Sequence, residues 1–216
     1  MLVALAFLTA ASGCSEGKPT VKPTASESLD TAMCRQTLGP SGIRWIEQRI
    51  TPAQLRFHTE KDFDKTRSFY YEKFREWRPD DLTNILPRST VMCRAQNSED
   101  HTKLLLLAYS YSYASFERNR QDKSRSTTPI NNDVFVSSSP DHSRTFEVFI
   151  RCQIPGAVSG QKDQVPVIGR LIDDLTGEDD ARVHYTHLLH SARVMVKALG
   201  CTNKPVVPAQ PPASVK

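Results

Sequence analysis

The chain has 216 residues, with 24% charged side chains and a formal net charge of +4 at pH 7. So small an excess of positive charge argues against nucleic-acid binding, which is typical of strongly basic domains. The nine glycines form no phosphate-binding loop and no His-Glu-x-x-His metal motif is present, so we predict that the protein is not an enzyme, binds no metal and uses no cofactor.

The first thirteen residues contain no charged side chain and end in Ala11, Ser12 and Gly13, directly before Cys14. This run is too short to span a bilayer, which takes about 20 apolar residues. It is typical of an export signal, which a peptidase cuts after small residues. Its end is similar to a bacterial lipobox, so we predict that residues 1–13 are a signal peptide and that Cys14 carries a lipid anchor.

Two features of this segment differ from a usual lipobox. Ala11 occupies the position where leucine is usual, and no lysine or arginine precedes Lys18, which a start site upstream of Met1 would explain. A second interpretation is that Cys14 is a free cysteine in an apolar, buried N-terminal strand. Lipidation would add a diacylglyceryl group, and two acyl chains hold a protein stably on a membrane. Lipidation of Cys14 therefore predicts that the protein lies on the outer face of the bacterial cytoplasmic membrane.

Polar segments that contain proline flank the middle of the chain. Residues 14–30 include Pro19 and Pro23 and have almost no apolar side chains, so they bury too little surface to offset their chain entropy. We expect a flexible tether there and a disordered, proline-rich tail at residues 204–216. Residues 31–203 then form one α+β domain of ordinary size.

Four cysteines remain when Cys14 is set aside: Cys34, Cys93, Cys152 and Cys201. An even number in an exported chain predicts two disulfides, and four cysteines allow three pairings. No Cys-x-x-Cys pair is present, which excludes a zinc ribbon. We favour Cys34–Cys93 and Cys152–Cys201, because each bond then lies within one half of the chain.

Two helices are predicted in the first half of the chain. Isoleucines at positions 43, 46 and 50 predict a short amphipathic helix over residues 41–50. Thr51 and Pro52 then predict the start of another helical turn. A stronger helix is expected over residues 62–78, where Phe63, Tyr70 and Phe74 share one stripe.

Strands follow, and then further helices. Alternating apolar and polar side chains predict strands over residues 90–95, 103–116, 133–137 and 144–154. The apolar spacing after residue 167 predicts a short helix closed by Gly177, and residues 179–199 predict a long helix closed by Gly200. Together these elements predict an α+β domain, with an antiparallel sheet of three to four strands and helices packed mainly on one of its faces.

Three groups of residues could carry chemistry. His184, His187 and His190 recur every third residue on the last helix, but the helical wheel places the last two on the solvent side. We therefore expect a solvated helix face and no metal site.

The tyrosines at positions 109, 111 and 113 share a strand face with two leucines, so we expect them in the core, with Ser110 and Ser112 facing outward or into a polar cavity.

The third group is a basic loop. It contains Arg118, Arg120, Lys123 and Arg125, interrupted by acidic residues. Lipid-binding clusters are usually denser in positive charge, so we expect a solvated loop.

Three stretches resemble a known group of proteins. They are Cys34-Arg35-Gln36-Thr37-Leu38, Phe149-Ile150-Arg151-Cys152, and His190-Ser191-Ala192-Arg193 followed by Leu199-Gly200-Cys201-Thr202-Asn203. These stretches resemble small exported lipoproteins of Streptomyces and related actinobacteria. The resemblance implies a position on the outer leaflet of a Gram-positive cytoplasmic membrane. It implies no activity.

We therefore predict a lipid-anchored extracellular domain that binds a protein, cell-wall or small-molecule partner and carries out no catalysis. The alternative is a cell-wall- or lipid-directed hydrolase whose active site is dispersed along the sequence. A solute-binding component of a transporter is a third idea, but such components usually have two lobes and longer chains.

Overall fold

The computed structural model describes residues 28–60, 62–79, 88–112, 114–139 and 142–215. They form one seven-stranded antiparallel sheet in the order β1-β2-β3-β7-β6-β5-β4. The strands are β1 Leu55–His58, β2 Thr90–Asn97, β3 Leu104–Tyr111, β4 Ser126–Pro129, β5 Val134–Ser139, β6 His142–Ile150 and β7 Val167–Asp173. The α+β class is confirmed, but the expected three to four strands were too few.

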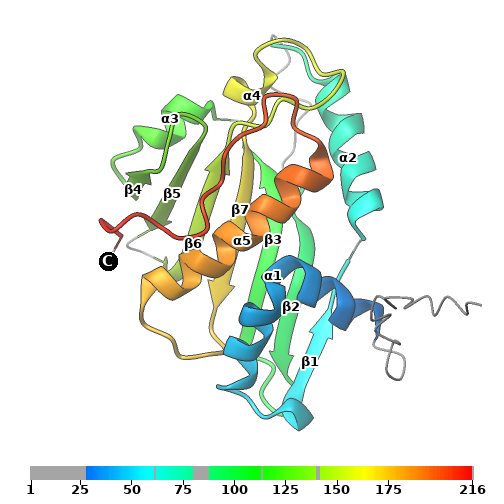
Figure 1. The fold of residues 1–216 in the computed structure, drawn as a ribbon, viewed down its shortest axis with the longest axis vertical. Helices are drawn as coiled ribbons and strands as arrows, with labels where there is room; N and C mark the ends of the chain where they lie inside the picture. Colours follow the sequence, from blue (N-terminus) through cyan, green and yellow to red (C-terminus); the bar gives the residue numbers. More distant parts are fainter. Residues whose placement is uncertain (1–27, 61, 80–87, 113, 140–141, 216) are drawn as a thin grey trace, which may run out of the picture.

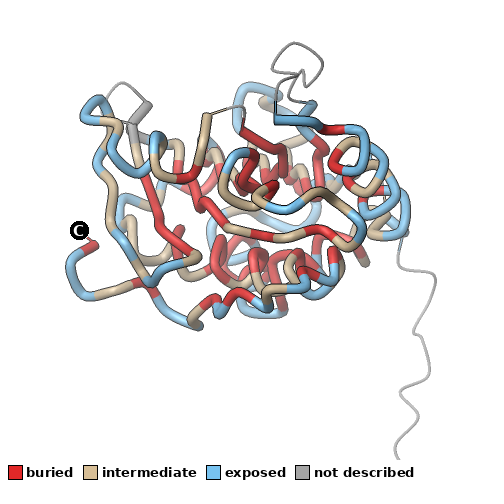
Figure 2. Tube along the Cα trace, turned by 90° about the horizontal axis from the view of Figure 1, so that it is seen from above, coloured by how far each residue is buried: buried red, intermediate tan, exposed pale blue. Residues whose placement is uncertain are grey.

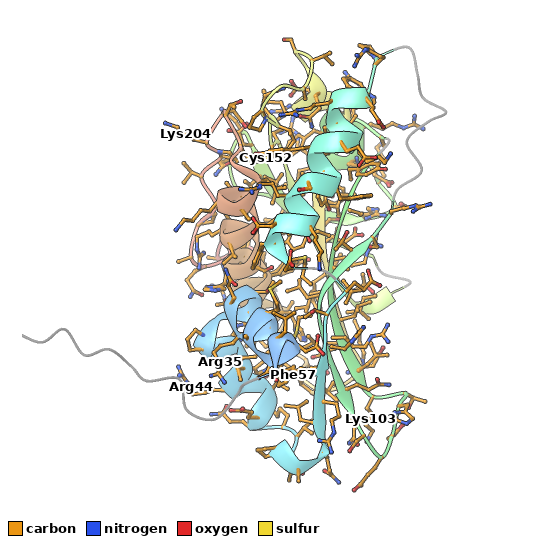
Figure 3. The ribbon with its side chains drawn as sticks, turned by 90° about the vertical axis from the view of Figure 1, so that its right-hand side faces the viewer. Arg35, Arg44, Phe57, Lys103, Cys152 and Lys204 are labelled. Carbon is orange, nitrogen blue, oxygen red and sulfur yellow. A yellow bond between two sulfur atoms is a disulfide. The ribbon has the colours of Figure 1, made fainter. Side chains whose placement is uncertain are left out.

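Three helices, α1 Leu29–Glu47, α2 Phe63–Glu76 and α5 Ala181–Leu199, lie in front of the sheet (Figure 1). Figure 3 shows the helix layer and the sheet side by side. The main core lies between the two layers, and buried residues gather there (Figure 2). Two short helices, α3 Phe116–Arg120 and α4 Gln161–Gln164, and a single 3-10 turn, Pro52–Gln54, complete the described elements.

The predicted helix after residue 167 was wrong, because this segment is β7, a central strand between β3 and β6. Val167 and Leu171 point to the helices, whereas Ile168 and Ile172 point to the other face. A central strand can carry apolar side chains on both faces, and a short run of this kind resembles one side of a helix. Two further strands, β1 and β4, are four-residue edge strands that the alternation did not reveal.

The first helix is longer than predicted and begins at Leu29, after the capping residue Ser28, whose hydroxyl accepts a hydrogen bond from the Thr31 amide. The expected tether therefore overlaps its first residues. Gly39 adopts a left-handed φ of 75° directly before Pro40 and divides α1 into two stretches. The second stretch is the predicted amphipathic helix. The expected helical turn at Thr51 closes as one 3-10 turn and continues into β1.

Both favoured disulfides are confirmed. Cys34 on α1 is bonded to Cys93 on β2, and Cys152 after β6 is bonded to Cys201 after α5. Each bond fastens the helix layer to the sheet or to its loops. Among the described residues, no helix is both long and apolar enough to cross a membrane.

The proline-rich C-terminal segment is packed against α5, which differs from the expected disordered tail (Figure 1). Val207 and Val215 are 7% and 6% exposed. Arginine side chains of α5 donate to its carbonyl oxygens: Arg193 to Pro208 at 2.5 Å and Arg182 to Pro212 at 2.8 Å. Prolines carry no amide hydrogen, so an extended segment of this kind leaves few donors without partners.

Candidate functional site

The candidate site is a cavity of about 360 Å³ on the sheet face opposite the three long helices. Ser110 on β3, Arg170 on β7 and Glu147 on β6 line it, and all three alternate with residues of the main core. Its apolar wall comes from Phe149 and Ile168. The cavity therefore combines charged, hydroxyl and aromatic groups on a rigid sheet.

A small second core places the cavity beside α3. Phe116 on α3 packs with Phe135, Phe149 and Ile168, so the helix covers one end of this sheet face. The Ser115 hydroxyl caps α3 by accepting from the Arg118 amide at 3.2 Å. The rest of this face, toward Ser110 and Arg170, is left open as the cavity.

A buried carboxylate and two arginines form the charged floor of the cavity. Glu147 is 4% exposed, and its Oε1 accepts from Arg170 Nε at 2.9 Å and Nη2 at 2.7 Å. Its Oε2 accepts from Arg125 Nη1. A buried carboxylate is costly unless it is paired, and here both oxygens are paired. Two guanidinium groups and one carboxylate leave this trio with a net charge of +1.

Two serines supply hydroxyl groups beside this trio. Ser112 Oγ accepts from the Ala114 amide and from Asn119 Nδ2, both at 3.0 Å. Its two acceptor positions are thus filled, and its own proton has no acceptor within the described part of the chain. Ser110 and Ser112 line the cavity, in agreement with the expectation for these serines. Tyr109 and Tyr111 are in the core as predicted, whereas Tyr113 lies outside the described residues.

The prediction that His187 and His190 face solvent was wrong for His187. It is 6% exposed, and its ring stacks on Trp45 of α1 with a centroid distance of 4.7 Å. His190 is half-buried and faces Gly39. The helical wheel located the side that packs on the sheet, but it could not show that α1 covers a second side of α5.

His184 is also buried, and it is hydrogen-bonded to Asp173. Its Nε2 lies 2.9 Å from Asp173 Oδ2, and its Nδ1 lies 3.1 Å from the Asp180 carbonyl oxygen. Burial opposes ionisation of Asp173, but hydrogen bonds from His184 and Thr176 outweigh it and hold the pKa of this carboxyl below its usual value. His184 is 1% exposed and Asp173 is fully buried, so the pair supports the fold and has no access to a substrate.

Burial also lowers the pKa of His187 to about 4, and the neighbouring His184 and His190 act in the same direction. The lowered pKa keeps the His187 ring neutral near pH 7. This agrees with the surroundings of Nδ1, which is buried and has no hydrogen-bond partner among the described residues. In the part of the chain that the structure describes, no three histidine, cysteine, aspartate or glutamate side chains could together hold a metal ion.

The basic loop is divided between solvent and the cavity. Arg118 and Lys123 are exposed, and Arg120 pairs with Glu117 at 2.6 Å. Arg125 instead turns inward to Glu147, so only part of the loop is solvated. Sequence reasoning missed the site roles of Arg125, Glu147 and Arg170. The only local signal is that Glu147 interrupts an otherwise apolar strand between Phe146 and Val148.

Cys14 precedes residue 28, where the described part of the chain begins, so its lipidation stays a prediction. A scan against family models and searches of curated proteins and of solved structures found no match.

Proposed function

We propose that this protein is an extracellular lipoprotein, anchored through Cys14 to the outer face of the bacterial cytoplasmic membrane, whose domain binds a partner and carries out no catalysis. The observation that carries the binding role is the asymmetry of the sheet. One face is packed under three helices, whereas the other holds the cavity with its arginines and hydroxyl groups. Concave sites with a few converging polar groups are the usual sites of ligand binding.

Three features support the anchor. Residues 1–13 have the pattern of an export signal, and small residues precede Cys14. The two disulfides are typical of proteins outside the reducing cytosol. The resemblance to actinobacterial lipoproteins leads to the same proposal, with a Gram-positive membrane as the support.

Two observations favour binding over the alternative of a hydrolase. Glu147 is the one carboxylate among the described lining residues, and guanidinium groups occupy both of its oxygens. A general base needs a free lone pair within reach of the substrate. Of the two histidine–carboxylate pairs in the described domain, His184–Asp173 is sealed inside the core, and His58–Asp30, at 4.0 Å, does not line the cavity. The partner is therefore a protein, a cell-wall component or a small molecule that is held but not converted.

Intact-protein mass spectrometry of the membrane fraction tests the anchor. We expect a mature chain that begins at Cys14 and carries the mass of a diacylglyceryl group. An unmodified chain that retains residues 1–13 would contradict the proposal, because neither cleavage nor lipidation would have occurred.

Photo-crosslinking in intact cells tests the binding face. A photoreactive residue at Ser89, which is exposed and lines the cavity, should capture a partner. The same residue at Arg44, which is exposed on α1 in the helix layer, is the matched control (Figure 3). Equal capture at both positions, or capture at Arg44 alone, would show that the open face is not the binding face.

A further inference from the structure

Resting on the proposed binding role, we infer that the cavity is a receptor site for a small organic anion, whose carboxylate or phosphoryl group is held by Arg170 and Arg125 and by the hydroxyl groups of Ser110 and Ser112.

The first argument is the number of free donors in the trio. Arg170 uses Nε and one hydrogen of Nη2 on Glu147, so Nη1 and the second Nη2 hydrogen have no partner among the described residues. Arg125 uses Nη1 on Glu147, and its Nε lies 3.5 Å from Asp122, which leaves Nη2. The side chains of Arg170 and Arg125 are 40% and 29% exposed, so a ligand can reach their outer ends. Two guanidinium groups held side by side are suited to the oxygens of one anion.

The second argument is the part played by Glu147. Its position beneath both arginines fixes their direction and offsets one of their two charges. Asp122, 3.5 Å from Arg125 Nε, offsets part of the second charge, so the outer nitrogens of Arg170 supply most of the attraction for one negative group. Because the carboxylate is 4% exposed and fully paired, it does not compete for donors on the ligand. The floor is therefore a pre-organised pair of guanidinium groups, and pre-organisation reduces the entropy lost on binding.

The third argument comes from the serines. Ser112 has both acceptor positions filled and can only donate toward the cavity, and the Ser110 hydroxyl forms no hydrogen bond with another described residue. The outer guanidinium nitrogens and the Ser112 hydroxyl can only donate to a ligand, and the Ser110 hydroxyl can also donate. A ligand rich in acceptors fits these donors, and the two guanidinium groups repel a cation.

The remaining wall is apolar and limits the size of the ligand. Phe149, Ile168 and Ala114 flank the donors, and the volume of about 360 Å³ lies at the low end of ligand pockets. The ligand class is thus a small anion whose charged group is attached to a compact body with one apolar side.

Isothermal titration of the full-length chain in a neutral detergent, at low ionic strength, tests this inference with three probes. Benzoate presents a carboxylate on a flat apolar body, inorganic phosphate presents the phosphoryl group alone, and benzamide is the uncharged counterpart of benzoate. We expect benzoate or phosphate to bind and benzamide not to bind. Because exposed charges are screened by salt, we expect the affinity to fall as sodium chloride is added.

Arg170→Gln removes the outermost guanidinium and should weaken anion binding at least about tenfold, which is the usual effect of losing a charge-assisted hydrogen bond. Ser112→Ala should weaken it less. Arg118→Gln is the matched control, because Arg118 is exposed on α3 and does not line the cavity. Near-native melting temperatures would show that each variant is folded.

Absence of binding by both anions at 10 mM, equal binding of benzamide, or equal losses in Arg170→Gln and Arg118→Gln would overturn the inference. These results are distinguishable from a failure of the proposed function. Crosslinking at Ser89 without anion binding would keep the binding role and reject the ligand class, whereas anion binding to a chain that is not lipidated would reject only the anchor.

Discussion

Arg170 on β7 lies directly opposite Glu147 on β6, and two guanidinium nitrogens of Arg170 donate to one carboxylate oxygen of Glu147. The two residues are 23 positions apart in the chain and meet only because β6 and β7 are antiparallel neighbours. Arg125 reaches the second oxygen of Glu147 from the loop before β4, so one carboxylate joins three separate segments.

Replacing this carboxylate should destabilise the fold. In Glu147→Gln the amide group of the new side chain faces one of the two guanidinium groups, so at least one arginine loses its acceptor. Both arginines remain partly in water, so we expect the free energy of unfolding to fall by about 2 kcal/mol, which is less than for a fully buried pair. Urea unfolding followed by circular dichroism measures this change.

Glu117→Gln is the control for this prediction. Glu117 pairs with Arg120 on the surface, and their side chains are 41% and 46% exposed. Exposed ion pairs contribute little to stability, so the free energy of unfolding of this variant should fall by less than about 0.5 kcal/mol. Equal losses in the two variants would mean that Glu147 forms an ordinary surface ion pair.

His187 should make the stability depend on pH. The pKa of its buried ring is about 4 in the folded state, against 6.5 for a free histidine. Between these values the unfolded chain binds a proton that the folded chain does not, so stability is fully present above pH 6.5 and is lost as the pH falls toward 4. We expect a loss of about 2 kcal/mol between pH 7 and pH 5, which urea unfolding at each pH measures.

His187→Phe keeps an aromatic ring against Trp45 but cannot be protonated. The loss between pH 7 and pH 5 should shrink to what the remaining groups contribute. If wild type and variant lose the same stability over this interval, a group other than His187 causes the pH dependence.

The sequence predicted those parts of the fold that have local signals. The helix predicted over residues 62–78 is α2, Phe63–Glu76, which Asp62 caps, and the last helix is closed by Gly200, whose φ is 60°. The number of cysteines predicted two disulfides, and the preference for bonds within each half of the chain selected the observed pairing among three. In each case the residues that carry the signal are close in the chain or belong to a residue type with few possible partners.

The errors have a common physical cause, since each depends on a neighbour that is distant in sequence. β7 was taken for a helix because only the strands on both sides of it explain apolar side chains on both of its faces. His187 was placed in solvent because α1, which covers it, packs on α5 through tertiary contacts alone. The same mistake about β7 hid the cavity, because Arg170 faces Glu147 only when residues 167–173 form a strand.

Gly39 permits α1 to pass close to α5. Its φ of 75° is unfavourable for any residue with a Cβ atom, and a Cβ atom there would lie 2.8 Å from the His190 ring. Gly39→Ala should therefore lower the free energy of unfolding by about 2 kcal/mol, part of it from backbone strain and part from the contact with the His190 ring. Gly160→Ala is the matched control, because Gly160 has a φ of 84° but nothing within 4 Å of the added Cβ atom.

Thermal unfolding of the two glycine variants separates these contributions. Gly160→Ala should show only the backbone cost of about 1 kcal/mol. If Gly39→Ala is no more destabilised than Gly160→Ala, the His190 ring moves aside freely, and close packing between α1 and α5 is not required at this point.

Two adjacent valines show whether the proline-rich C-terminal segment belongs to the folded domain. Val207 is 7% exposed and packs on the main core, whereas Val206 is 72% exposed. Val207→Ser should destabilise the protein by about 1 to 2 kcal/mol, since it removes a buried apolar side chain and introduces a hydroxyl group. Val206→Ser makes the same chemical change one residue away and should cost less than about 0.5 kcal/mol. Chemical unfolding of the two variants in parallel measures the difference, and equal stabilities would show that residues 204–215 are not held against α5 in solution.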